Sequence, residues 1–127
     1  GVLLEVNCET DFAARNEEFQ AMVRDLCLHI AASAPEVVSQ DELSEERVAK
    51  ERGFFTEQVK EMGKPEQVVP KIVDGMIEKW YSEVCLLKQP FVKEPKQTVE
   101  DYFQGMIGKI GENMKIRRFV RYEIGGK

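Results

Sequence analysis

The stretch that decides the fold is GVLLEVNCETDFAARNEEF, from Gly1 to Phe19. Its first nine residues are mostly apolar and include β-branched positions, which predicts a largely buried strand. Thr10 then offers a side-chain oxygen to the first free backbone N–H groups of a helix. Asp11 follows in the first turn, where the helix dipole favours negative charge. The stretch therefore predicts a strand that runs directly into a capped helix.

The predicted helix has one apolar face, made of Phe19, Val23, Leu26 and Ile30. Steps of three, four and seven residues place these side chains on the same side. Pro35 is expected to end the helix, because the residue before a proline is driven out of helical backbone. We therefore expect one long helix from Thr10 to the residues just before Pro35.

Phe12, in the first turn, admits two interpretations. At about 100° per residue it is in phase with Phe19 and Ile30, which predicts a core aromatic at the start of the buried stripe. Asn16 lies on the same face between them, and about 10 Å of helix rise separates Phe12 from Phe19, so the ring can instead project beyond the core. A projecting aromatic beside an acid would suit an anchor that fills a pocket of a partner protein.

The remaining elements are predicted from the spacing of apolar residues and from the residues that start and end helices. Three further helices are predicted, over residues 44–63, 65–89 and 98–111, with Ser44 and Thr98 at their starts. Residues 36–43 read as a very short strand and a loop, and residues 89–97, QPFVKEPKQ, as an irregular connection. Residues 113–126 alternate as a strand does. That alternation places on one side Met114, Ile116, Arg118, Val120, Tyr122 and Ile124.

These elements predict an α+β fold: a small antiparallel sheet of about three strands packed against several long helices. The first and last strands are expected to pair with each other. The length of 127 residues is a natural size for one domain with a real core, so residues 1–127 are expected to form a single domain.

Composition excludes several classes of protein. Hydrophobic residues at 43% and charged residues at 32% are typical of a globular chain, and no apolar run approaches the roughly 20 residues that span a bilayer. A net charge of −5 argues against general nucleic-acid binding. The segment KIRRFVRY, residues 115–122, is either a nucleic-acid-binding strand with interleaved aromatics or a half-solvated strand with Phe119 or Tyr122 in the core.

Catalytic signals are weak. The sequence contains no phosphate loop, no GxSxG, no HExxH and no glycine-rich dinucleotide turn. Its three cysteines, Cys8, Cys27 and Cys85, form no CxxC, and one histidine, His29, leaves no Cys/His zinc set. His29 flanks the apolar stripe and is read as a boundary histidine rather than a catalytic base. We therefore expect no cofactor, no metal and no enzyme activity, and a protein-binding module instead.

Several separate blocks resemble the translation elongation factor Ts family, in that family's order. The blocks are GVLLEVNCETDFAARNEEF, HIAASAPE, GKP, VDGMIEKWYSEVCLLKQPFVKEPKQTV and GENMKIRRFVRYEIG, and the similarity runs over nearly all of the chain. It is to the core domain of that family in its short, single-copy form. By this resemblance residues 1–127 are the core that carries dimerisation and partner binding.

The resemblance implies a guanine-nucleotide exchange factor. Members of the family bind elongation factor Tu, the GTPase that delivers aminoacyl-tRNA, in its GDP-bound or nucleotide-free form, and speed GDP release without covalent chemistry. The family's Thr-Asp-Phe-Val motif, which inserts near the magnesium site of the GTPase, stands here as Thr10, Asp11, Phe12 and Ala13. By resemblance Phe12 wedges between partner side chains and Asp11 disturbs the magnesium environment. His29 matches a position that contacts the partner near its phosphate loop.

Further expectations come from the same resemblance. The helical N-terminal domain of the family is expected to be absent, since Gly1 already belongs to the first core strand, and binding is expected to be weaker for that reason. A homodimer stays open as a second partner, with no membrane and no direct nucleic-acid contact. The expected location is a bacterial cytoplasm, or the stroma or matrix of an organelle such as a plastid. The alternative function is a non-catalytic ribosome- or RNA-associated protein-binding module.

Overall fold

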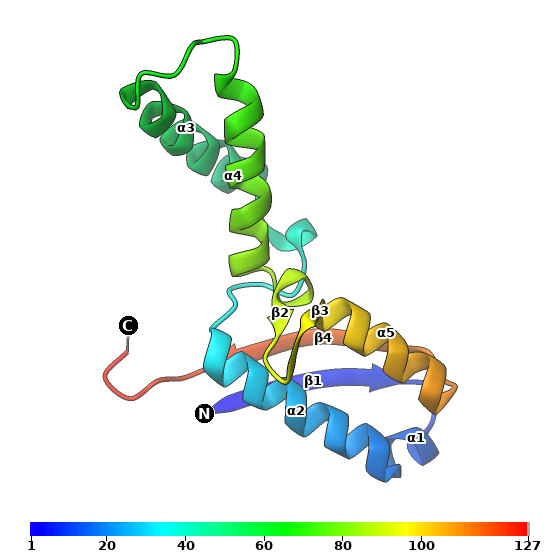
Figure 1. Cartoon of the computed structure of the whole chain (residues 1–127). Coiled ribbons are helices and arrows are strands. Elements are labelled where there is room, and N and C mark those ends of the chain that lie inside the picture. Colours follow the sequence, from blue (N-terminus) through cyan, green and yellow to red (C-terminus); the bar gives the residue numbers. More distant parts are fainter. Residues whose placement is uncertain (127) are drawn as a thin grey trace.

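A short sheet with helices on one face carries a projecting pair of helices (Figure 1). The computed structural model describes residues 1–126. Its α-helices and strands are β1 (Val2–Cys8), α1 (Asp11–Arg15), α2 (Glu17–Ser33), α3 (Glu45–Glu61), α4 (Val69–Val84), β2 (Pro90–Phe91), β3 (Glu94–Thr98), α5 (Val99–Ile110) and β4 (Met114–Arg121). The predicted α+β class is confirmed. Lys127, the last residue of the predicted domain range, lies outside the described residues.

The first and last strands, β1 and β4, pair antiparallel as the sequence predicts. In residues 1–126 the strands form two separate pairs, β1–β4 and β2–β3, rather than one sheet of about three. The prediction of an irregular connection over residues 89–97 is wrong, because Phe91 pairs with Glu94 and Pro90 with Thr98. Phe91 is buried in the main core, which draws this hairpin onto the helices. Prolines are tolerated here because both strands of a two-stranded pair have a free edge.

A β-bulge interrupts β4. Glu5 pairs with Arg118 and Val6 with Ile116, so Arg117 has no partner in β1. One extra residue on one strand shifts the side-chain alternation by one position. The strand therefore changes the face it presents to the core at Arg117.

The bulge contradicts the alternation predicted for the last strand. Phe119 packs against the core on the side of Met114 and Ile116, while Val120 faces outward and is 42% exposed. Of the two interpretations of KIRRFVRY, the structure supports a half-solvated strand with Phe119 at the core. The residues wrongly placed with Met114 are Arg118, Val120, Tyr122 and Ile124, all of them exposed.

The single long helix predicted after Thr10 is in fact two helices. α1 ends at Arg15, and Asn16 has extended backbone with φ −66° and ψ 133°. The Asn16 carboxamide oxygen accepts hydrogen bonds from the backbone N–H groups of Glu18 (2.7 Å) and Phe19 (3.3 Å), which caps α2. Asparagine competes with helical backbone bonds through such contacts, so it separates the two helices.

The helix predicted over residues 65–89 is shorter than expected. α4 ends at Val84, and Cys85 then makes a parallel bridge with Val37. The backbone N–H of Glu36 donates to the Val84 carbonyl at 2.8 Å, and that of Leu86 donates to the Val37 carbonyl at 2.8 Å. These bonds to a distant segment end the α-helix, and only a short 3-10 turn, Leu86–Lys88, follows. No local sequence pattern indicates such bonds.

Two apolar clusters lie at opposite ends of the chain's long dimension. The main cluster fills the space between the sheet and helices α2 and α5, and Met22, Leu26 and Ile30 are fully buried there. The second lies between α3 and α4, which project away from the sheet as an arm, and includes Val59 and Trp80. Neither cluster includes a residue of α1, which lies at the end of the sheet.

Candidate functional site

α1 lies at the end of the β1–β4 sheet opposite the N-terminus (Figure 1). Its successive side chains differ in environment: Asp11 is exposed, Phe12 is 84% exposed, and Ala13 is only 4% exposed. The structure therefore supports the interpretation of Phe12 as a projecting aromatic. The break at Asn16 is the reason, because it takes Phe12 out of phase with the buried stripe that begins at Phe19. We call residues 10–13 the tip.

Thr10 starts the helix that carries Phe12. Its backbone is extended, with φ −135° and ψ 158°, and its hydroxyl oxygen accepts a hydrogen bond from the Ala13 backbone N–H at 3.3 Å. This is the N-cap that the sequence predicts. Ala13 is small and buried, so it seats the turn against the body while the larger ring of Phe12 stays outside.

Glu112, in the turn between α5 and β4, binds the tip from across the sheet. One carboxylate oxygen accepts the backbone N–H groups of Glu9 (3.1 Å) and Thr10 (3.0 Å), and the other accepts the Thr10 hydroxyl at 2.6 Å. In return, the Glu9 carboxylate accepts the backbone N–H of Asn113 at 2.7 Å. The two turns at this end of the sheet are therefore tied to each other by four hydrogen bonds.

Packing within the chain does not explain why a phenylalanine stands at position 12, because its ring is almost fully exposed. A buried phenylalanine would contribute about 1.5–3 kcal/mol to stability through the hydrophobic effect, and this one forgoes nearly all of it. Among the aromatic side chains of residues 1–126 it is the most exposed, ahead of Tyr122 and Phe54. An aromatic ring held outside the core on a fixed backbone is the kind of residue that anchors protein interfaces.

His29 lies apart from the tip, twelve residues into α2 and therefore about 18 Å along that helix. It is fully buried. Its Nδ1 accepts the backbone N–H of Val92 at 3.1 Å, so Nε2 carries the proton and donates to the Gln89 carboxamide oxygen at 2.8 Å. Gln89 in turn donates to the backbone carbonyls of Glu83 (2.8 Å) and Ser33 (3.4 Å).

This network joins three parts of the fold: α2, the end of α4 and the β2–β3 hairpin. Burial lowers the pKa of His29, although its hydrogen bond to Gln89 acts in the opposite direction. A neutral ring fits the network, because only the neutral form can accept the N–H of Val92. The structure thus places His29 in the interior as a support of the hairpin and does not bring it to the surface of the tip.

The hairpin is held on its other side as well. The Phe91 ring stacks on the Tyr102 ring with centroids 4.2 Å apart. The Asp25 carboxylate accepts the Tyr102 hydroxyl at 3.4 Å and lies 2.8 Å from the Lys93 ammonium. Burial, reinforced by the charge and the hydrogen bond of Asp25, raises the pKa of Tyr102 to about 12.

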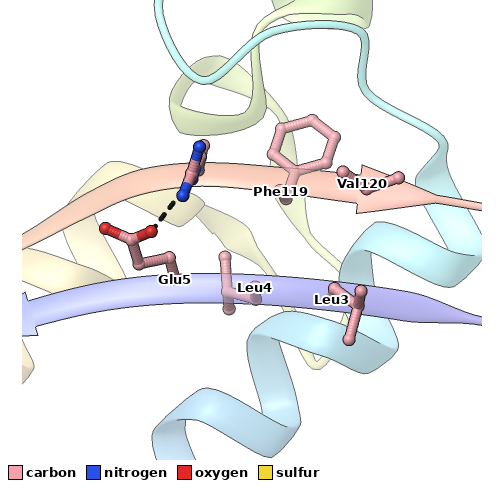
Figure 2. Close-up of a pocket in the computed structure, with 6 residues that line it drawn as sticks. Leu3, Leu4, Glu5, Phe119 and Val120 are labelled. Atoms are coloured by element: carbon pink, nitrogen blue, oxygen red, sulfur yellow. Dashed lines mark hydrogen bonds and ion pairs between the residues drawn. The ribbon is translucent and has the colours of Figure 1, made fainter.

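Two of the basic residues of the last strand, Arg118 and Arg121, bond within the chain. The Arg118 guanidinium donates to the Glu5 carboxylate at 2.9 Å, and that of Arg121 donates to the Ala31 carbonyl at 3.0 Å. Figure 2 shows the outer face of the sheet, where a shallow hollow of about 340 Å³ lies beside the Glu5–Arg118 pair. Leu3 and Val120 are the exposed apolar residues of this face.

Within residues 1–126, no group of three or more His, Cys, Asp or Glu side chains is arranged to hold a metal ion. None of the helices over the same residues combines the length and apolar character that crossing a bilayer requires. The tip itself offers an aromatic ring and a carboxylate, which suits binding to another macromolecule.

Comparison with known proteins shows to which family the chain belongs. Residues 20–125 match the family described as Elongation factor TS. The chain belongs to the elongation factor Ts family. It is 54% identical over 125 residues to elongation factor Ts of Acetivibrio thermocellus, 53% to that of Alkaliphilus oremlandii and 49% to that of Geobacter metallireducens. These alignments cover 98% of this chain and 58% of each relative.

The comparisons show the family of the chain but assign no role to the residues of the tip. This chain spans 58% of the length of the curated relatives named above. The residues matched to the family start at position 20, after the tip. The roles of Thr10, Asp11, Phe12 and Ala13 therefore stay predictions from the motif, to which the structure adds their geometry.

Sequence reasoning missed Glu112 and Glu9. GENM was recognised as part of a block similar to elongation factor Ts, but nothing in its spacing says that its glutamate bonds to residues 9 and 10. The pairing of Cys8 with Met114 across β1–β4 is the signal that would have found it, since it places the two turns together. That register becomes visible only once the two strands are aligned.

Proposed function

We propose that this chain promotes guanine-nucleotide exchange on elongation factor Tu, by docking the tip beside the GDP–magnesium site of that GTPase. Phe12 carries the proposal: it is 84% exposed on a turn whose backbone is fixed by Thr10 and Glu112. Membership of the elongation factor Ts family supports the coarser role in translation elongation. The protein would then work where elongation factor Tu works, in a bacterial cytoplasm or in an organelle.

Exchange by this route needs no covalent step. Magnesium and preformed backbone donors bind the diphosphate in GTPases, so a factor that disturbs them weakens GDP binding. A factor that binds best when the nucleotide site is distorted lowers the affinity of the GTPase for GDP. By linkage, bound GDP must lower the affinity of the GTPase for the factor by the same amount. It therefore speeds release without selecting GTP over GDP, and nucleotide concentrations decide which one rebinds.

Each residue of the tip has a distinct proposed role. Phe12 is the wedge, because its ring is free to enter a pocket between partner side chains. Asp11 brings an exposed carboxylate to the magnesium environment. There it would compete with the ligands of the magnesium ion for the metal, or repel those that are anionic. Thr10 fixes the turn as the N-cap, and Ala13 seats it against the body.

His29 is proposed to act differently from the tip. The direct partner contact implied by the resemblance stays a prediction, and it requires the ring to leave a fully buried position. A supporting role fits its surroundings better: His29 fixes the hairpin backbone at Val92, whose side chain is exposed beside α2. Loss of His29 would then act on partner binding through the hairpin.

The test is release of a fluorescent GDP from elongation factor Tu in the presence of magnesium, followed by stopped flow. The chain is compared with Phe12→Ala and with Phe54→Ala, a matched control on the arm that is 59% exposed. Truncation of an interface anchor is expected to slow release roughly 30-fold, since such residues contribute about 2 kcal/mol or more. Phe54→Ala is expected to match the parent.

Two results would count against the proposal. Equal acceleration by the parent and by Phe12→Ala, with equal folding, would remove Phe12 as the wedge. No acceleration by a well-folded parent, even at high concentration, would remove exchange as an activity of this chain. Circular dichroism and thermal unfolding of each variant provide the folding control.

A second copy of the chain is a further proposed partner. The outer face of β1–β4 exposes Leu3 and Val120 beside an acid and a base, Glu5 and Arg118 (Figure 2). A two-fold axis through this face would bury the same residues of both copies, as an isologous interface requires. Sedimentation of the parent and of Leu3→Glu tests it: a dimer lost in the variant supports the proposal, and a monomeric parent contradicts it.

A further inference from the structure

Both carboxylate oxygens of Glu112 accept hydrogen bonds from residues more than a hundred positions earlier in the chain. We infer that Glu112 is a positioning residue for nucleotide exchange, which acts through the pose of the tip and above all through that of Phe12. This inference rests on the proposed function of the tip. It assigns to Glu112 no contact with the GTPase.

α1 has little means of holding itself in place. It has five residues, about one and a half turns, and helices this short are unstable on their own. Its only buried side chain is that of Ala13, the smallest side chain that can bury apolar surface. The pose of the turn must therefore be set at its two ends, by Thr10 at the start and Asn16 at the finish.

At the start, Glu112 decides where the Thr10 hydroxyl points. That hydroxyl has one proton, which it donates to Glu112 at 2.6 Å, and its lone pairs are then directed to accept the Ala13 N–H at 3.3 Å. The other carboxylate oxygen fixes the two backbone N–H groups that precede the helix, those of Glu9 and Thr10. Without Glu112 the hydroxyl is free to rotate, and both backbone N–H groups form hydrogen bonds with water instead.

The consequence falls on Phe12 rather than on the core. These bonds lie at the surface, so their loss lets the turn fluctuate without opening either apolar cluster. If the productive pose of Phe12 falls to a tenth of the population, the apparent affinity for the GTPase falls by the same factor. Binding selects the productive pose, so the exchange rate at saturating factor should change much less than the concentration needed to reach half of it.

Three substitutions at one position separate positioning from charge. Glu112→Ala removes all three bonds, and Glu112→Asp keeps the charge but is one methylene too short to span the three donors. Glu112→Gln keeps the length and one acceptor oxygen. We expect the half-saturating concentration in GDP release to rise about tenfold for the alanine and aspartate variants, and less than about threefold for glutamine.

The deciding experiment is a double-mutant cycle between Glu112→Ala and Phe12→Ala, read as fluorescent GDP release from elongation factor Tu with the whole chain. With Phe12 present, Glu112→Ala is expected to reduce release at low factor concentration about tenfold; in the Phe12→Ala background, less than twofold. The matched control is Glu17→Ala, which removes an exposed acid near the tip and is expected to match the parent.

Each outcome decides the matter. An equal loss in both backgrounds, or a loss as large in Glu17→Ala, would overturn the inference in favour of direct or general electrostatic contact. If the single variant Phe12→Ala accelerates GDP release from elongation factor Tu as much as the parent does, the proposed function of Phe12 fails and the inference fails with it. If Phe12→Ala is slow and Glu112→Ala matches the parent, only the inference fails. Should Glu112→Ala not fold, Glu112→Asp takes its place in the cycle.

Discussion

The buried pair of His29 and Gln89 gives the sharpest prediction about stability. His29→Ala removes a fully buried imidazole and leaves two polar groups without partners, the Gln89 carboxamide oxygen and the backbone N–H of Val92. Both belong to the junction of α2, the end of α4 and the hairpin. The substitution therefore acts on three parts of the fold at once.

The magnitude follows from two contributions. Truncating a buried side chain of this size to alanine typically lowers stability by about 2–5 kcal/mol through lost packing and the remaining cavity. Each orphaned polar group adds roughly 1–3 kcal/mol unless water reaches it. A polar cavity of this kind admits a water molecule, which offsets much of the second contribution. We therefore expect the free energy of unfolding to fall by about 4 kcal/mol.

Urea unfolding followed by circular dichroism at pH 7.5 measures this change. Leu28→Ala, at the neighbouring exposed position, serves as the control and should change the free energy of unfolding by less than about 0.5 kcal/mol. A loss below about 1 kcal/mol for His29→Ala would refute the reasoning. It would mean that the hairpin is held without the imidazole, by its other contacts with α2 and α5.

Three further predictions follow from named contacts. As the pH falls below about 6.5, the unfolded chain binds a proton that folded His29, with its lowered pKa, does not, so stability should decline by up to about 1.4 kcal/mol per pH unit. His29→Gln should remove that part of the slope in urea titrations between pH 5 and 7.5, and an unchanged slope would contradict the assignment. Asn16→Ala should lower the free energy of unfolding by about 1 kcal/mol, because the N–H groups of Glu18 and Phe19 lose their cap; thermal unfolding measures it, and no change would contradict the capping role. Phe12→Ala should change stability by less than about 0.5 kcal/mol, and a larger loss would show that the ring packs within the chain.

Local chemistry predicted the outline of the fold well. Thr10, Ser44 and Thr98 each cap a helix where the sequence places a start, and Gly63 and Gly111 have positive φ at helix ends. A mostly apolar run identified the first strand and alternation the last, and the expected antiparallel pairing of the two is confirmed. These features depend on neighbours a few residues apart, which a sequence displays directly.

The misses have a common physical cause. The bulge at Arg117, the end of α4 at Val84 and the hairpin around Phe91 are all fixed by contacts between distant segments. Periodicity carries no information about such contacts, so it continued the strand and the helix past their true ends. Asn16 differs, because its capping chemistry is local, and the polar pair of Arg15 and Asn16 was a readable signal of the helix break.

The tip was predictable only in part. Its residues follow from the family motif, and Thr10 from capping preference. The exposure of Phe12 depends on the helix break at Asn16, whereas periodicity alone continues one helix and predicts that Phe12 is buried with Phe19. Glu112 lay beyond reach, since its three bonds depend on the register of β1 against β4. The support of a proposed binding residue is set by the fold as a whole, even where the residue itself belongs to a recognisable motif.

The most direct test of the account places 4-fluorophenylalanine at position 12, and separately at position 54, and records the ¹⁹F shift in H₂O and in D₂O. An exposed fluorine shows a solvent isotope shift that disappears on burial. The account predicts a large isotope shift at position 12 in the free chain, lost when elongation factor Tu with bound GDP is added, and little change at position 54. An isotope shift at position 12 that persists in the formed complex would contradict the claim that Phe12 enters the partner.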